Sequence, residues 1–178
     1  MFSLSLILLH AQTLSALAVP QREAIYRAAG AEFYPERGWA LCYDPEYPFR
    51  ARITKFADLN GDGRPEAVVE QDSPFCYGNH GSGTILLTRL ANGKWAKIVI
   101  GEAEVFGKDL RGGLTFLKRR GVGRWPDILV RRVASYHCDA IFRFDGKTYR
   151  LNRLRYVGQN GTAVTLDPGT HDIGCGPK

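Results

Sequence analysis

The chain has 178 residues, of which 44% are hydrophobic and 24% charged, with a formal net charge of +6 at pH 7. This composition is typical of a globular domain large enough for one core, and it excludes a disordered or collagen-like chain. No stretch reaches the ~20 consecutive apolar residues that a transmembrane helix needs, so we expect no membrane span.

The chain begins with an apolar run at residues 2–9, followed by Ala16-Leu17-Ala18. The second segment is a small-x-small pattern of the kind that precedes signal-peptidase cleavage, and the run is too short to cross a bilayer. We therefore expect residues 1–18 to be a secretory signal peptide and the mature chain to begin near Val19. This predicts an exported protein, either periplasmic or secreted.

The cysteines agree with export. The four are Cys42, Cys76, Cys138 and Cys175, an even number without C-x-x-C spacing. This pattern predicts two disulfides rather than a zinc or redox site. Three pairings are open, and we favour Cys42 with Cys76 and Cys138 with Cys175, because the second bond would hold the Gly-rich C-terminal tail.

Residues 20–29 predict the one short helix, because alanines and Ile25 recur on one face and Gly30 can end it. The aromatic and Pro-rich segment that follows either stacks on a sugar or packs its rings together, and we favour packing. We expect residues 19–49 to form an N-terminal helix and connector.

From residue 50 onward the pattern is that of strands, with turn-forming dipeptides such as Asn92-Gly93 and Asp145-Gly146 between apolar runs. The predicted strands lie at residues 53–56, 67–69, 85–90, 95–100, 114–117, 128–133, 140–144 and 149–154. The sequence therefore predicts an all-β fold, mainly antiparallel, with one short N-terminal helix.

The predicted strands fall into two similar sets. Residues 63–69 resemble residues 123–130, and the hairpin at 85–95 resembles that at 140–149. Such a period predicts two four-stranded units. The predicted parts are a first β unit at residues 50–107, a second at 108–156 and a disulfide-held tail at 157–178. Two units can pack as a sandwich, form an open fragment or dimerise, and the sequence leaves this choice open.

An oxygen-rich loop, Asp58-Leu59-Asn60-Gly61-Asp62-Gly63-Arg64-Pro65-Glu66, connects the first two predicted strands. Side-chain oxygens at Asp58, Asn60 and Asp62 alternate with small or turn-forming residues, so a curled loop can point them at one hard cation. Arg64 can add its carbonyl, and Glu66 is a further carboxylate. Oxygen ligands of this kind bind calcium. The alternative is an ordinary polar turn, since Asn-Gly and Asp-Gly are common hairpin dipeptides.

The same residues resemble the FG-GAP/VCBS-type repeat, whose motif D-x-N-x-D-G-x-x-D lies between two strands of an integrin-alpha-like propeller blade. The resemblance implies that Asp58, Asn60, Asp62, the Arg64 carbonyl and Glu66 are ligands of one structural calcium ion. It covers about one blade, and Glu66 stands where the family usually has Asp. A standard EF-hand would need a glutamate at the twelfth loop position, which holds a valine. The units are therefore expected to be propeller-blade-like.

Positive charge is concentrated in the second unit. Residues 108–155 contain thirteen Lys or Arg against four Asp or Glu, so this span carries +9 and the rest of the chain is mildly acidic. The predicted anion-binding residues are Lys118, Arg119, Arg120, Arg124, Arg131 and Arg132. They fit an anionic polysaccharide, the cell envelope or an acidic protein, and an exported address argues against nucleic acid. The alternative is a solvated surface without a partner.

No catalytic residue is predicted. The motif-like loop at residues 76–83 contains His80 and a glycine-flanked Ser82, but G-x-S-x-G is absent. We expect an exported, calcium-binding, non-catalytic interaction module. The alternative is a small exported hydrolase or enzyme inhibitor that uses this loop together with His137.

Overall fold

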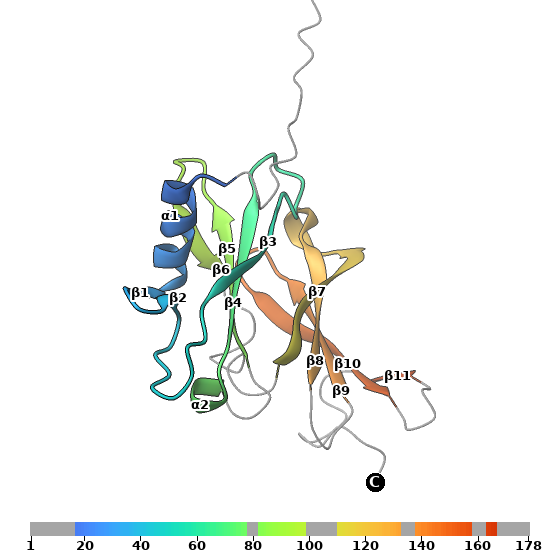
Figure 1. Ribbon diagram of the computed structural model, residues 1–178. Helices are drawn as coiled ribbons and strands as arrows, with labels where there is room; N and C mark the ends of the chain where they lie inside the picture. The colour runs from blue at the N-terminus through green and yellow to red at the C-terminus, as the bar shows by residue number, and fades with distance from the viewer. Residues whose placement is uncertain (1–16, 78–81, 99–109, 133–137, 158–162, 167–178) are drawn as a thin grey trace, which may run out of the picture.

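A computed structural model describes residues 17–77, 82–98, 110–132, 138–157 and 163–166 of the chain (Figure 1). The predicted all-β, mainly antiparallel fold with a short N-terminal helix is confirmed. No helix among these residues is long and apolar enough to cross a membrane.

Helix α1 (Val19–Ala29) is the predicted N-terminal helix. It has Pro20 in its first turn and ends at Gly30, whose φ of 84° is a left-handed conformation that favours glycine. Leu17 lies just before the helix, on the signal-peptide side of the expected boundary, and is only 5% exposed. The N-terminal segment is therefore part of the packed structure from residue 17 onward.

Strands β1 (Glu32–Tyr34) and β2 (Gly38–Ala40) form a short hairpin within the expected connector. The aromatic rings of this region contact one another and α1. Trp39 stacks on Tyr26 of the helix with 5.4 Å between ring centroids, and Phe33 meets Trp39 edge-on. These contacts favour the packing interpretation over a sugar-stacking surface.

The first sheet consists of β3 (Arg52–Ala57), β4 (Glu66–Asp72), β5 (Ser82–Arg89) and β6 (Trp95–Ile98), in that order and all antiparallel. Chain neighbours are sheet neighbours, so each predicted strand pairs with the next. Helix α2 (Pro74–Tyr77) lies in the connection between β4 and β5.

The second sheet contains β7 (Leu110–Arg120), β8 (Pro126–Arg132), β9 (Cys138–Phe144), β10 (Tyr149–Val157) and β11 (Ala163–Leu166), also in chain order. A 3₁₀ turn, η3 (Val122–Arg124), connects β7 to β8. The fifth strand, β11, lies in the segment expected to be the tail. Its four-residue run is short, and the Asn160-Gly161 turn signal before it was the clue to a further hairpin.

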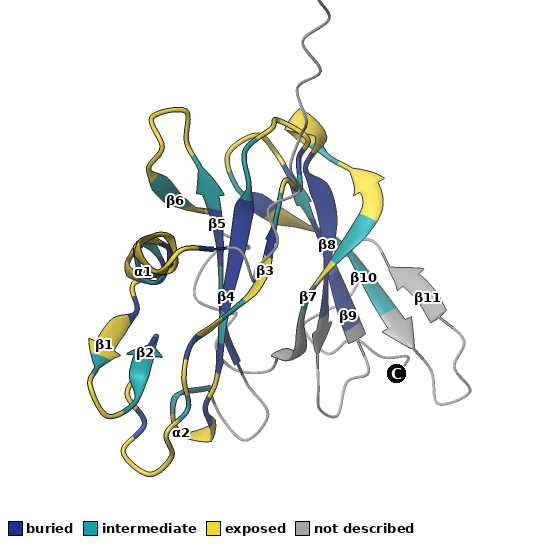
Figure 2. Cartoon of the chain, turned by 45° about the horizontal axis from the view of Figure 1, so that its top comes forward, coloured by how far each residue is buried: buried dark blue, intermediate teal, exposed yellow. Residues whose placement is uncertain are grey.

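The two sheets pack face to face, which is the sandwich among the arrangements that the sequence left open. Val68 and Leu86 of the first sheet share one buried cluster with Trp125, Ile128, Val130, Ala140, Phe142, Phe144 and Tyr149 of the second. On the opposite face of the first sheet, Ala67 and Val69 pack with Ile25 of α1. Figure 2 shows β4 and the described part of β8 as buried central strands. The order of layers is therefore helix, first sheet, second sheet.

A disulfide joins Cys42 to Cys76, the pairing that the sequence favoured. Such a bond is compatible with export to an oxidising compartment. Gln71, fully buried on β4, accepts hydrogen bonds from the N–H groups of Leu41 and Cys42 and donates to the Cys42 carbonyl at 2.7 Å. The expected partner of Cys138, Cys175, lies outside the described residues.

Candidate metal centre

The predicted calcium loop connects β3 to β4 at one end of the first sheet (Figure 1). Gly61 and Gly63 have φ values of 76° and 83°. These left-handed conformations curl the chain tightly, and any other residue would be strained there. The two glycines thus provide the curl that the sequence pattern predicted.

Hydrogen bonds from the loop backbone hold its oxygen-bearing side chains in place. Asp58 Oδ1 accepts from the N–H groups of Gly61 and Asp62, and its Oδ2 accepts from Gly63 at 2.9 Å. Asn60 Oδ1 accepts from Asp62, and Asp62 Oδ1 accepts from Arg64, both at 2.8 Å.

Three of these oxygens keep bonding capacity. Asp58 Oδ2, Asn60 Oδ1 and Asp62 Oδ1 each accept a single backbone N–H. A carboxylate or amide oxygen has two lone pairs, so each retains one for a further partner. The loop therefore presents oxygens of the type that calcium takes as ligands.

Glu66 begins β4 and is fully buried. Its Oε2 accepts from the Leu59 N–H at 2.7 Å and its Oε1 accepts from the Thr88 hydroxyl at 3.0 Å. Burial raises the pKa of this carboxyl to about 7, and the negative charges of Asp62 and Asp58 add to the rise. The carboxylate of Glu66 is therefore poorly solvated and lies within electrostatic reach of Asp58 and Asp62.

Asp127 occupies the corresponding place on β8 of the second sheet and is also buried, at 1% exposed. Arg143 on β9 donates to it from Nε at 3.0 Å and from Nη2 at 2.7 Å. In the first sheet, Thr88 on β5 stands directly opposite Glu66. No salt bridge among the described residues involves Glu66. The first sheet thus lacks the guanidinium that neutralises the buried carboxylate of the second.

Arg64, the predicted carbonyl ligand, also uses its side chain within the loop. Its Nη2 lies 2.6 Å from Asp62 Oδ2, and its Nε donates to the Arg89 carbonyl at 3.0 Å. This ion pair is partly exposed, so solvent weakens it. A cation bound in the loop would compete with Arg64 for Asp62.

The loop also meets two of the predicted anion-binding arginines. Arg120, at the end of β7, donates to the Leu59 carbonyl at 2.6 Å. The Arg124 guanidinium carbon would lie 3.3 Å from a Cβ added to Gly61. Lys118 and Arg119 are exposed. Arg131 and Arg132 belong to β8, and their side chains lie outside the described residues.

The oxygen atoms of the loop are of the type that calcium binds, but they do not surround a single point in this structure. Within the described ranges, no group of three or more His, Cys, Asp or Glu side chains lies close enough to hold a metal ion. The loop adds the Asn60 amide and the Arg64 carbonyl to its carboxylates, which are the mixed oxygen ligands that calcium prefers. Calcium binding would draw Asp58, Asp62 and Glu66 closer together.

The described residues of the 76–83 loop give little support to the alternative catalytic interpretation. Ser82 begins β5, is 4% exposed and stands opposite Asp72. The Tyr77 hydroxyl would lie 2.3 Å from a Cβ on Gly83, so the tyrosine ring covers this strand closely. A buried serine is poorly placed to attack a substrate. His80 and His137 lie outside the described residues.

Sequence reasoning missed two interactions that distinguish the two buried carboxylates. It singled out Glu66 but neither the hydroxyl of Thr88 opposite it nor the pairing of Asp127 with Arg143. The internal similarity contained the signal, because aligning residues 85–95 with residues 140–149 places Thr88 where Arg143 stands.

Comparisons of the chain with protein-family models, with curated proteins and with solved structures found no match.

Proposed function

We propose that this protein is an exported β-sandwich domain that binds one calcium ion in the 58–66 loop and serves as a non-catalytic interaction module. The observation that carries the proposal is the contrast between the two buried carboxylates. Asp127 is neutralised by Arg143, whereas Glu66 faces Thr88 and feels the negative charges of Asp58 and Asp62. A divalent cation would supply the positive charge that the first sheet lacks.

In this proposal, the ligands are the side-chain oxygens of Asp58, Asn60, Asp62 and Glu66, together with the Arg64 carbonyl. The ion is structural, since it joins the β3–β4 loop to the first residue of β4. The guanidinium groups of Arg64, Arg120 and Arg124 lie around the loop and oppose the approach of a cation. We therefore expect a weak site with a dissociation constant of about 0.1 to 1 mM, which would add roughly 1 to 2 kcal/mol at millimolar calcium.

Loop variants test the site. Asp58→Ala and Asp62→Ala should lower the melting temperature in calcium to the value found in chelator, because each removes a ligand. Asp145→Ala is the matched control. Asp145 Oδ1 accepts backbone N–H groups from Lys147 and Thr148 in a turn of the second sheet. This control should lose equal stability in calcium and in chelator. Asp58 or Asp62 variants that keep the wild-type calcium response would contradict the site.

An anionic surface or polymer is the partner that the charge distribution favours. Lys118 and Arg119 are exposed, and Arg120 beside them binds the calcium loop through Leu59. The proposed binding surface therefore adjoins the proposed metal site.

Heparin retention tests this surface. Retention should fall steeply with salt and with the double change Lys118→Glu and Arg119→Glu, because screening and charge reversal both remove the attraction. These two residues avoid the structural bonds of Arg120. Arg50→Glu with Lys94→Glu is the control, since both side chains are exposed and lie outside the second sheet. Equal losses for the two double variants would argue against a defined surface.

A further inference from the structure

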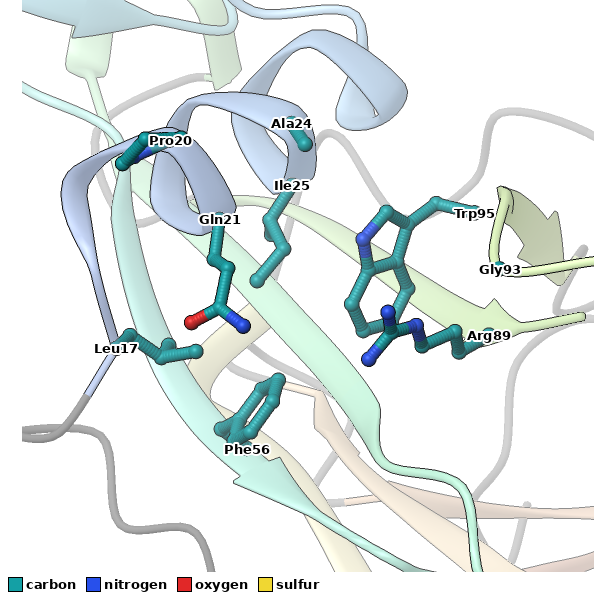
Figure 3. Close-up of a pocket in the computed structure, with 9 residues that line it drawn as sticks. All are labelled: Leu17, Pro20, Gln21, Ala24, Ile25, Phe56, Arg89, Gly93 and Trp95. Atoms are coloured by element: carbon teal, nitrogen blue, oxygen red, sulfur yellow. The ribbon is translucent and has the colours of Figure 1, made fainter.

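A pocket of about 210 Å³ lies between α1 and the β5–β6 hairpin (Figure 3). It is on the helix-covered face of the first sheet. Its apolar walls are Leu17, Ile25, Phe56 and Trp95. These side chains belong to the cluster that joins α1 to the first sheet or pack against it. The pocket is therefore built from core residues of the domain.

Two polar side chains enter this pocket, and both point toward its middle in Figure 3. Arg89 is half-buried, and its guanidinium has no hydrogen bond or ion pair with any described residue. Gln21 uses its Oε1 to accept the Ala18 N–H at 3.1 Å, which leaves its amide NH₂ to donate. Arginine can only donate. The pocket thus offers hydrogen-bond donors and a positive charge, and none of the described residues that line it is acidic.

We propose that this pocket binds a free monocarboxylic acid with a short apolar body. The carboxylate accepts from the Arg89 guanidinium and the Gln21 amide, and the body packs between Phe56 and Trp95. A charged group in a partly desolvated apolar setting gains most from an opposite charge. The volume holds about seven groups of water size at ~30 Å³ each, which fits an acid of medium chain length such as octanoate.

The lining is rich in donors, with Gln21 Oε1 already bonded to the Ala18 N–H, and this favours a free acid over the C-terminus of a peptide. A peptide brings backbone N–H groups that need acceptors, and burial without them would be unfavourable. The groups that carry this inference, Gln21, Phe56, Arg89 and Trp95, all follow residue 18. Removal of the expected signal peptide would therefore take away Leu17 and the Ala18 N–H that Gln21 accepts, and leave the other lining residues in the chain.

Octanoate titrated into the full chain, by calorimetry and tryptophan fluorescence, tests the proposal. Saturable binding to one site is expected. Octanol, which lacks the charge, and acetate, which lacks the body, should each bind at least about tenfold more weakly, a loss of ~1.4 kcal/mol. A short leucine-terminated peptide should compete poorly.

Variants test separately how the charge of Arg89 and the space in the cavity contribute to octanoate binding. Arg89→Gln should weaken octanoate binding by at least about tenfold. Arg50→Gln, the same change at an exposed arginine, should leave it intact. Ala24→Phe should abolish binding without any change of charge, because Ala24 lines the pocket from an exposed position on α1. The proposal is overturned if millimolar octanoate shows no saturation, if octanol or the peptide binds as well, or if Arg89→Gln and Ala24→Phe both bind like the wild type.

Discussion

Glu66 lies at the start of β4 with its carboxylate shielded from water. Its pKa of about 7 means that a proton and a metal ion would compete for it near neutral pH. In the unfolded chain the same carboxyl would lose its proton near its ordinary value of 4.5. Between these two values the folded protein binds the proton more tightly than the unfolded chain does. Without calcium, the contribution of Glu66 to stability is therefore full below pH 4.5 and is lost as the pH rises through 7.

Glu66→Gln should remove this part of the pH dependence. The glutamine amide can still accept from the Leu59 N–H and bond to the Thr88 hydroxyl, so the local hydrogen bonds survive. In chelator, the free energy of unfolding of the variant should rise relative to that of the wild type by roughly 2 to 3 kcal/mol between pH 4.5 and 8. Urea unfolding at pH 5 and pH 8 measures the difference. Parallel pH profiles for the two proteins would show that Glu66 is not the responsible group.

At this scale the sequence predicted a good part of the loop. The spacing of Asp58, Asn60 and Asp62 and the two glycines predicted a curled turn with ordered oxygens, and the turn has these features. It did not predict the Arg120 contact, because that arginine is 61 residues from Leu59. Such a contact depends on how the sheets pack, and local pattern carries no information about it.

The elements differ in how far local pattern determines them. The strands of the sandwich alternate with turn dipeptides, so their positions could be predicted to within a few residues. β1 and β2 have three residues each, too few for a period to emerge. Their pairing depends on contacts such as that of Trp39 with Tyr26. β11 is similarly short, with four residues paired to β10.

The segment that carries Cys42 is held in two ways, by the disulfide to Cys76 of α2 and by hydrogen bonds to Gln71 of β4. Gln71→Leu would leave partly buried backbone groups of Leu41 and Cys42 without their glutamine partner. It should lower the free energy of unfolding by about 1 to 3 kcal/mol, the usual cost of stranded polar groups. Cys42→Ser with Cys76→Ser should cost about 2 to 4 kcal/mol.

Urea unfolding under oxidising conditions measures both effects. Asp72→Asn serves as the control, since Asp72 follows Gln71 on the strand but is exposed and forms a surface ion pair with Arg52. Such pairs contribute about 0 to 1 kcal/mol. If Gln71→Leu lowered the free energy of unfolding no more than this control, the proposed stabilising role of Gln71 would be wrong.

In the whole molecule, β4 is the strand that both layers of packing share. Its consecutive apolar residues predicted a strand covered on both faces, and α1 covers one face while the second sheet covers the other. The sequence could not identify the covering layers, because two units with apolar faces can pack within one chain or between two chains. The sandwich brings Arg120 and Arg124 of the second sheet to the loop of the first. Two of the six predicted anion-binding residues, distant from the loop in the sequence, therefore adjoin it in the fold.

The central claim is that the 58–66 loop binds calcium, and a thermal melt of the oxidised full chain tests it most directly. The melt is recorded in excess chelator and then in millimolar calcium or millimolar magnesium. The account predicts that calcium raises the melting temperature by about 2 to 8 °C, the shift that 1 to 2 kcal/mol produces in a domain of this size. Magnesium should have less effect because it demands a smaller, more regular shell. Identical melts in chelator and calcium would contradict the account and make the loop an ordinary turn.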